Sequence, residues 1–202
     1  MSNDTLPRRR NARGEGDRLR VELLEAAADL LGEHGTIEGI SLRSVARRAG
    51  VSATAVYRHF DDHTELIRQA VEFCWTNFHD MLVQATDGVD DTFEAFERCG
   101  LGYAAFATDR QGQYRVLFSN RIALPGGRPS AGDATFQILV DLVRDMLSAL
   151  DDDRDPFFVA VQVHTWIHGI VDLMGCHPDM DWPPMLDQLD GLRTSLRLVR
   201  PA

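Results

Sequence analysis

Lysine is absent from this sequence of 202 residues, and all 21 basic residues are arginines, a bias that we interpret as a codon preference of the source genome. Cysteine is scarce as well. The three cysteines, Cys74, Cys99 and Cys176, are odd in number and widely spaced. They argue against a disulfide framework and predict reduced thiols in a cytoplasmic protein.

Long apolar segments are also missing. No apolar run reaches the roughly 18 residues that a membrane-spanning helix needs. The arginines at 8–10 and 13 are not followed by an apolar stretch, which argues against a secretory signal peptide. Hydrophobic residues still make up 44% of the chain, so we expect a substantial core and no membrane partner.

The sequence contains no nucleophile elbow, phosphate-binding loop or HExxH motif. The acidic run 151–153 is more simply a solvated helix boundary than a set of catalytic carboxylates. We therefore predict a protein that is not an enzyme and that needs no cofactor.

Charge is distributed unevenly along the chain, whose net charge is −10. Residues 1–60 hold ten arginines and eight acidic residues, whereas residues 61–202 hold eleven and 23. Residues 39–60 contain four arginines and no acidic residue. This local positive field suits contact with a polyanion, which the rest of the chain would repel.

Apolar residues recur with a helical period, and neither strand alternation nor an internal repeat is present. The polar segment 1–16 is expected to be a disordered arm. We predict an all-α fold with a three-helix head over 17–60 and a larger body over 61–202, which begins with a connecting helix at about 61–85. The five further body helices are expected near 90–108, 112–121, 133–150, 154–176 and 184–199.

Residues 41–60 have the pattern of a helix-turn-helix. Ser41 and Ser52 are suitable N-caps for two short helices, the second of about seven residues. Ala46 permits a close helix crossing, and Gly50 can take a positive φ in the turn. The apolar contacts between the helices are expected from Val45, Val51 and Val56. An ordinary helical hairpin with a solvated arginine face is the alternative.

In a helix-turn-helix, the first residues of the second helix meet base edges in the major groove of DNA. Ala53 and Ala55 offer only methyl contacts there, and Thr54 offers a hydroxyl. Arg43 and Arg58 could bind guanine with two hydrogen bonds. Phosphate contacts suit Ser41, Ser52, Tyr57 and His59.

At this point the chain resembles a known family. The segments Ser41-Leu42-Arg43, Val45-Ala46, Ala49-Gly50-Val51-Ser52, Val56-Tyr57-Arg58-His59-Phe60 and Glu65-Leu66 look like the TetR family of bacterial transcriptional regulators. This resemblance covers residues 17–66. Trp166-Ile167-His168-Gly169 also resembles the Trp-x-His-Gly element of a C-terminal domain found in one TetR subgroup.

The resemblance implies a homodimer that binds a near-palindromic, double-stranded DNA operator, with half-sites roughly 34–36 Å apart at the one-turn limit. It implies dimerisation through the last two long helices, about 154–176 and 184–199. It also implies repression that is relieved by a small apolar or amphipathic ligand in the body. Alternatives are an activator, a regulator that responds to a protein partner, or a helical enzyme or binding protein whose helix-turn-helix no longer binds DNA.

The resemblance also assigns individual residues. Arg43 matches a base-contacting arginine of some members, and Tyr57 and His59 match positions that contact the DNA backbone. His63 stands where the family commonly has a lysine that grips phosphate; it would be mostly neutral at pH 7, which predicts weaker or pH-sensitive binding. The predicted DNA-binding residues are Ser41, Arg43, Ser52, Ala53, Thr54, Ala55, Tyr57, Arg58, His59 and His63.

Body aromatics at helical spacing are more often core than ligand contacts. Some can line an apolar cavity, and the candidates are Tyr103, Phe106, Tyr114, Phe118, Phe136 and Trp166. His164 and His168, four apart on one predicted helix, could face a metal ion. We favour a packing or interface role, because His168 belongs to the Trp-x-His-Gly element. Gly169 suggests close helix approach, which suits a dimer interface more than a metal site.

Overall fold

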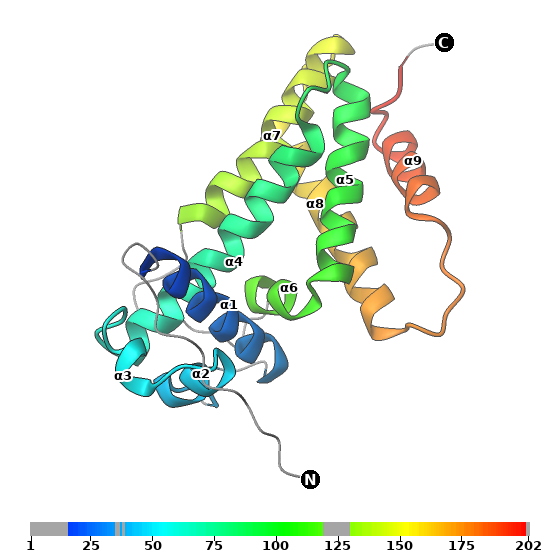
Figure 1. The fold of residues 1–202 in the computed structure, drawn as a ribbon. Coiled ribbons are helices and arrows are strands. Elements are labelled where there is room, and N and C mark those ends of the chain that lie inside the picture. Colours follow the sequence, from blue (N-terminus) through cyan, green and yellow to red (C-terminus); the bar gives the residue numbers. More distant parts are fainter. Residues whose placement is uncertain (1–15, 35–36, 38, 119–129, 201–202) are drawn as a thin grey trace. The chain divides into compact units, whose positions relative to one another are not determined.

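The computed structural model describes residues 16–34, 37, 39–118 and 130–200. Over these residues the chain is helical and contains no strand (Figure 1). The predicted all-α fold is therefore confirmed. The predicted disordered arm lies outside the described residues except for Gly16, and so does the break predicted at 125–127.

The described residues form two compact units. The first runs to Trp75 and also includes Gly112–Phe118, whereas the second comprises Thr76–Gln111 and the described residues from Ser130 onward. The domain boundary predicted after residue 60 differs from this division, because half of the connecting helix and a later short helix pack with the head.

The first unit contains α1 (Gly16–His34), α2 (Leu42–Arg48), α3 (Ala53–Val56), the first half of α4 (His63–Thr86), and α6 (Gln111–Phe118) from Gly112 onward. One side of α1 is buried, including Leu23, Ala27 and Leu31. Gly32 of α1 lies directly against Gly112 of α6, and a Cβ atom at Gly32 would overlap the Gly112 backbone. This glycine contact fixes α6 to the N-terminal helices.

The second unit contains the rest of α4, α5 (Thr92–Asp109), α7 (Ser130–Ala149), α8 (Pro156–Cys176) and α9 (Met185–Ser195). Within it, α7 packs along α8, and α5 contacts α7, α8 and α9 (Figure 1). The largest fully buried side chains of this unit are those of Phe96, Phe106, Met146, Leu147, Leu189 and Leu198.

The acidic run lies between α7 and α8 and has local structural roles. Asp151 takes a left-handed conformation, with φ 52°, just after α7. Asp152 forms an ion pair with Arg154 at 2.7 Å, and the guanidinium of Arg154 holds the pKa of Asp152 below its usual value. Asp155 caps α8 by accepting a hydrogen bond from the Phe157 amide at 3.0 Å.

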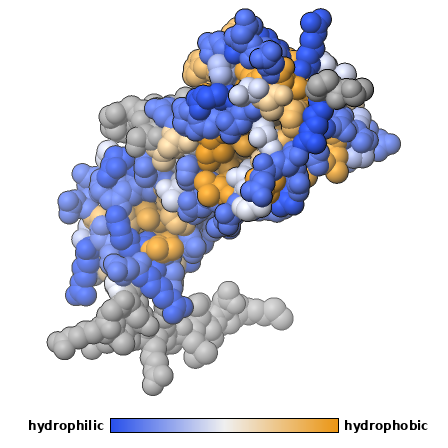
Figure 2. Space-filling view, turned by 90° about the horizontal axis from the view of Figure 1, so that it is seen from above, coloured by the Kyte–Doolittle hydropathy of each residue, from blue (hydrophilic) through white to orange (hydrophobic). Residues whose placement is uncertain are grey.

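By length and average composition, α8 is apolar enough to cross a membrane, although the sequence contains no sufficiently long uninterrupted apolar run. One side of α8 packs on α5 and α7 and buries Val159, Val163 and Ile167. Only 28% of the most apolar 18-residue stretch of α8 is buried within the chain. Apolar side chains thus reach the molecular surface. Figure 2 shows hydrophobic residues among the hydrophilic ones on one face of the molecule. Those exposed on α8 are Phe157, Phe158, Val161 and Leu173.

Candidate nucleic-acid interface

Both ends of α2 are fixed by local hydrogen bonds. Ser41 and Ser44 form a reciprocal cap: the Ser41 hydroxyl accepts from the Ser44 amide at 3.1 Å, and the Ser44 hydroxyl accepts from the Ser41 amide at 2.8 Å. Such caps stabilise a helix by about 0.5–2 kcal/mol. At the other end Gly50 has φ 69°, and the Val51 amide donates to the Ala46 carbonyl at 2.9 Å. The turn thus uses the positive φ predicted for Gly50.

The next helix, α3, is capped by Ser52, whose hydroxyl accepts from the Ala55 amide at 3.3 Å. It spans four residues, not the seven or so predicted. The chain continues as tight turns, in which the His59 amide donates to the Val56 carbonyl at 2.9 Å. Buried Val56 and Phe60 anchor this segment in the first unit.

The contact between α2 and α3 uses the residues predicted for it. Val45 and Val56 are fully buried, Ala46 is almost fully buried, and Val51 is half-buried. The small side chain of Ala46 allows the steep crossing of a helix-turn-helix. The local sequence and the packing therefore agree on one geometry.

The predicted contact residues remain accessible on this scaffold. Tyr57 is 57% exposed, although it is a large aromatic residue. The other exposed members are Ser41, Arg43, Ser52, Thr54 and Arg58, and those that are partly buried are Ala53, Ala55, His59 and His63. The helix-turn-helix thus presents a polar, positively charged surface.

The arginines of α2 have two different roles. Arg43 and Arg47 are four residues apart, are exposed, and have no ion-pair partner among the described residues. Arg48 instead binds Glu33 of α1, with Nη1 donating to Oε1 at 3.0 Å. This hydrogen bond is the main reason that the pKa of Glu33 lies below its usual value. Arg47 is not among the DNA-binding residues predicted from the sequence, although its spacing from Arg43 places both on one helix face.

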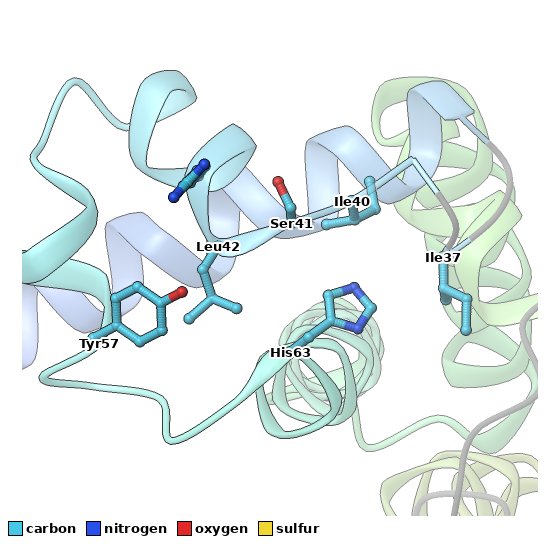
Figure 3. A pocket seen from close by; sticks show the side chains of 7 residues that line it. Ile37, Ile40, Ser41, Leu42, Tyr57 and His63 are labelled. Atoms are coloured by element: carbon cyan, nitrogen blue, oxygen red, sulfur yellow. The ribbon is translucent and has the colours of Figure 1, made fainter.

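An open groove of about 540 Å³ lies beside this surface within the first unit. Figure 3 shows the Tyr57 ring and the His63 ring reaching toward it from the end of α3 and the start of α4. The lining residues are Ile37, Ile40, Ser41, Leu42, Arg43, Tyr57 and His63. The groove thus combines an apolar wall with polar groups and one permanent positive charge.

The start of α4 is tied to α1. Asp62 caps the helix by accepting from the Glu65 amide at 2.9 Å. The Glu65 side chain pairs with Arg68, which is the main reason that its pKa is lowered. Arg20 of α1 lies over the Phe60 ring at 5.3 Å and hydrogen-bonds with Gln69. These contacts hold the groove between fixed elements.

The predicted ligand residues fall in different units. Tyr114 and Phe118 belong to the first unit, where the Trp75 ring meets Phe118 at 5.6 Å between centroids. The second unit holds Tyr103, Phe106, Phe136 and Trp166. The six residues therefore do not form a single site within either unit.

Two histidines lie among the aromatic residues of the second unit. The Tyr103 hydroxyl and His168 Nδ1 form a hydrogen bond at 3.0 Å. The His164 ring stacks on His168 at 5.8 Å and meets the edge of Phe136 at 5.6 Å. No cluster of three or more metal-binding side chains occurs in the part of the chain that the structure describes. Both imidazoles thus have aromatic neighbours within this unit.

Two family models match the chain. The model of bacterial regulatory proteins of the tetR family matches residues 23–70, and that of the tetracyclin repressor-like C-terminal domain matches residues 96–187. The chain belongs to the TetR family. Members of the family are DNA-binding transcription regulators and not enzymes. The Trp-x-His-Gly subgroup remains a prediction.

Individual proteins are also similar to the chain in sequence or structure. An HTH-type transcriptional regulator of Haemophilus influenzae is 34% identical over 101 residues, which are 50% of this chain and 49% of that protein. The match thus spans about half the length of that relative. A Rhodococcus protein of unknown function is 25% identical, with a TM-score of 0.74, over 96% of this chain and 98% of its own.

A structure of NalD, the secondary repressor of the MexAB-OprM multidrug efflux pump in Pseudomonas aeruginosa, also has this fold. It is 18% identical, with a TM-score of 0.59, over 90% of this chain and 96% of its own. At this identity the similarity supports the fold alone.

Proposed function

We propose that this TetR family protein is a cytoplasmic repressor that binds a near-palindromic DNA operator as a homodimer and is released by a small apolar or amphipathic ligand. The observation that carries the proposal is the exposed face of α2 and α3. There Arg43, Arg47 and Arg58 have no acidic partner among the described residues. Unpaired arginines on a helix-turn-helix are the groups that phosphates and guanine attract.

In this proposal α3 makes few contacts with DNA bases. Its exposed hydroxyl is Thr54, and Ala53 and Ala55 supply methyl groups. Base recognition then depends on Arg43, Arg58 and the shape of the DNA. The hydroxyl and imidazole groups around them position the backbone without reading it, and they belong to Ser41, Ser52, Tyr57, His59 and His63.

The exposed apolar side of α8 supports dimerisation. Phe157 and Phe158 are 57% and 60% exposed within one chain, and Val161 and Leu173 extend the same kind of surface. Exposed apolar patches of this kind mark association surfaces in water. In the proposed dimer, α8 and α9 of two copies pack together and set the separation of the two heads.

Repression and release complete the proposal. One protein of similar fold, NalD, is itself a repressor. The ligand would bind among the body aromatics near Tyr103 and Phe136. Coupling of about 1–3 kcal/mol between ligand and DNA would change operator affinity about 5- to 150-fold.

Fluorescence anisotropy with DNA from upstream of the protein's own coding sequence tests DNA binding. Arg43→Ala should weaken binding and relax sequence preference, because it removes a proposed base contact. Arg47→Ala should weaken binding and reduce the salt slope by about 0.9, because it removes a proposed phosphate contact. Arg48→Ala is the matched control, since Glu33 already binds this guanidinium. Absence of a specific complex at low salt, or equal effects of all three variants, would contradict the assignment.

Ligand release has a separate test. Native mass spectrometry of the purified protein should show a dimer together with any co-purified small molecule. Candidate ligands then enter the anisotropy titration. If a bound molecule leaves operator affinity unchanged, the protein binds DNA without the proposed release.

A further inference from the structure

Arg20 of α1 connects three elements of the first unit. Its guanidinium carbon lies over the Phe60 ring, 5.3 Å from the ring centroid. Its Nη2 atom donates a hydrogen bond to Oε1 of Gln69 in α4. Its Nη1 atom is buried and has no hydrogen-bond partner among the described residues. The guanidinium is therefore directed toward Phe60 and α4 inside the first unit.

Phe60 is almost fully buried at the end of the segment that follows α3. This segment carries three of the proposed DNA contacts, Tyr57, Arg58 and His59. The His59 and Phe60 amides both donate to the Val56 carbonyl, at 2.9 and 3.1 Å. Because α3 spans only four residues, helical hydrogen bonds alone give it little stability. The orientation of the segment therefore depends on how Phe60 is held.

The other contact of Arg20 belongs to a chain of side chains at the start of α4. Gln69 Nε2 donates to Oε1 of Glu65, and Glu65 binds Arg68 at 2.9 Å. A guanidinium is planar, so it can stack on an aromatic ring and donate hydrogen bonds from its edge at the same time. Arg20 thus links α1 to both Phe60 and α4 with one side chain.

We propose that Arg20 is a positioning residue for DNA recognition, which fixes the segment 57–60 against α1 and α4 without contacting DNA. The stacking on Phe60 and the hydrogen bond to Gln69 carry this inference. It rests on the proposed DNA-binding function. Arg20 should therefore act on operator affinity in a different way from Arg43 and Arg47, whose proposed contacts are with DNA itself.

The salt dependence of binding separates these two roles. Loss of a phosphate contact reduces the slope of log affinity against log salt by about 0.9, because one fewer phosphate is neutralised. Loss of a positioning contact weakens binding and leaves this slope unchanged. Substitutions that touch neither ligand typically change coupling by an amount that corresponds to about 2- to 30-fold in affinity.

The test is operator affinity of the full chain with Arg20→Met, which keeps an unbranched stem and removes the guanidinium. We expect affinity to fall by about 2- to 30-fold at an unchanged salt slope. Arg20→Lys keeps the charge without the planar group and should also bind more weakly than wild type. The control is Arg98→Met, because Arg98 is half-exposed in the second unit and pairs with Glu94 of its own helix at 2.6 Å.

Hydrogen exchange gives a second readout that needs no DNA. In Arg20→Met the amides of His59 and Phe60 should exchange faster than in wild type, because their segment opens more readily. The amides of Val45 and Ala49, which donate within α2, should keep their wild-type rates. Equally faster exchange at all four amides would indicate general destabilisation and overturn the inference.

The binding measurements can also overturn the inference. They do so if Arg20→Met or Arg20→Lys binds like wild type, if the salt slope of Arg20→Met falls by about 0.9, or if Arg98→Met shows the same loss. When wild type binds its operator specifically, these outcomes leave the proposed function standing. If wild type forms no specific complex, the proposed function fails, and the exchange rates still test whether Arg20 orders the segment 57–60.

Discussion

Asp151 and Arg197 take a left-handed backbone conformation at helix ends, with φ 52° and 56°. After α9 the Leu198 amide donates to the Arg193 carbonyl at 2.8 Å, which closes the turn. Leu198 is fully buried, so its packing holds Arg197 in place. For residues with a Cβ atom this conformation costs about 1–2 kcal/mol.

Arg197→Gly should therefore stabilise the protein. Relief of strain outweighs the greater freedom of glycine in the unfolded chain, and we expect a gain of up to about 1 kcal/mol. Urea denaturation should show a higher midpoint with an unchanged slope. Arg197→Ala is the control, because it removes the side chain and retains the strain. An equal gain from alanine would mean that the guanidinium, and not the backbone, is responsible.

The Glu33–Arg48 pair predicts a pH-dependent contribution to stability. Arg48 lowers the pKa of Glu33 in the folded protein, so the contribution is present above the unfolded value, about 4.3, and is lost as pH falls through the folded value. Arg48→Gln should thus be slightly less stable than wild type at pH 7 and equal to it by roughly pH 3. Urea denaturation at both values measures the difference, and Arg47→Gln, which breaks no observed ion pair, should show no such trend.

At the scale of elements, the contact between α1 and α6 depends on glycine. A Cβ atom at Gly32 would overlap the backbone of Gly112, whereas a Cβ atom at Gly112 would lie 3.4 Å from the nearest Gly32 atom. Backbone atoms cannot rotate away as a side chain can. The two positions of one contact therefore tolerate alanine unequally.

Gly32→Ala should destabilise the protein by about 1–3 kcal/mol, because it overpacks a backbone contact. Gly112→Ala is the matched variant and should change stability by less than about 1 kcal/mol, since the gain in helix propensity offsets a tight contact. Thermal and urea unfolding of both variants checks the asymmetry. Equal losses would mean that α1 and α6 are not in contact through these glycines.

Local signals made much of this architecture predictable. The caps Ser41 and Ser52 and the turn at Gly50 depend on neighbouring residues, and all three occur as predicted. The pairing of Arg48 with Glu33 joins different helices, so helical periodicity could not reveal it. The placement of α6 with the head likewise depends on a contact between residues distant in sequence, Gly32 and Gly112. The end of α9 at Ser195, not near 199, follows from the buried side chain of Leu198.

At the scale of the whole molecule, the ligand site was the least predictable part. Aromatic spacing identifies residues that face inward, but it does not tell which helices pack together. Tyr114 and Phe118 accordingly lie with Trp75 in the first unit, and Tyr103 contacts His168 in the second. The helix-turn-helix was more predictable, because its contacts lie within 20 residues of sequence.

The exposed side of α8 predicts that one substitution can separate the proposed dimer. Phe158→Asp places a charge on the apolar surface and should yield monomers by light scattering, with operator affinity reduced by at least about tenfold because two heads no longer bind together. Phe157 is less suitable, since its ring also contacts Phe136. Val83→Asp, at another exposed apolar position, is the control. A dimeric Phe158→Asp variant would move the interface away from this surface.

The alanines of α3 have a consequence for divergence after gene duplication. Ala53 and Ala55 are partly exposed, and neither is among the buried residues of its helix. In the proposed complex with DNA, a longer polar residue at either position would add a base contact with little loss of stability. Duplicated copies could thus acquire new operators one substitution at a time, while the scaffold that carries α3 stays the same.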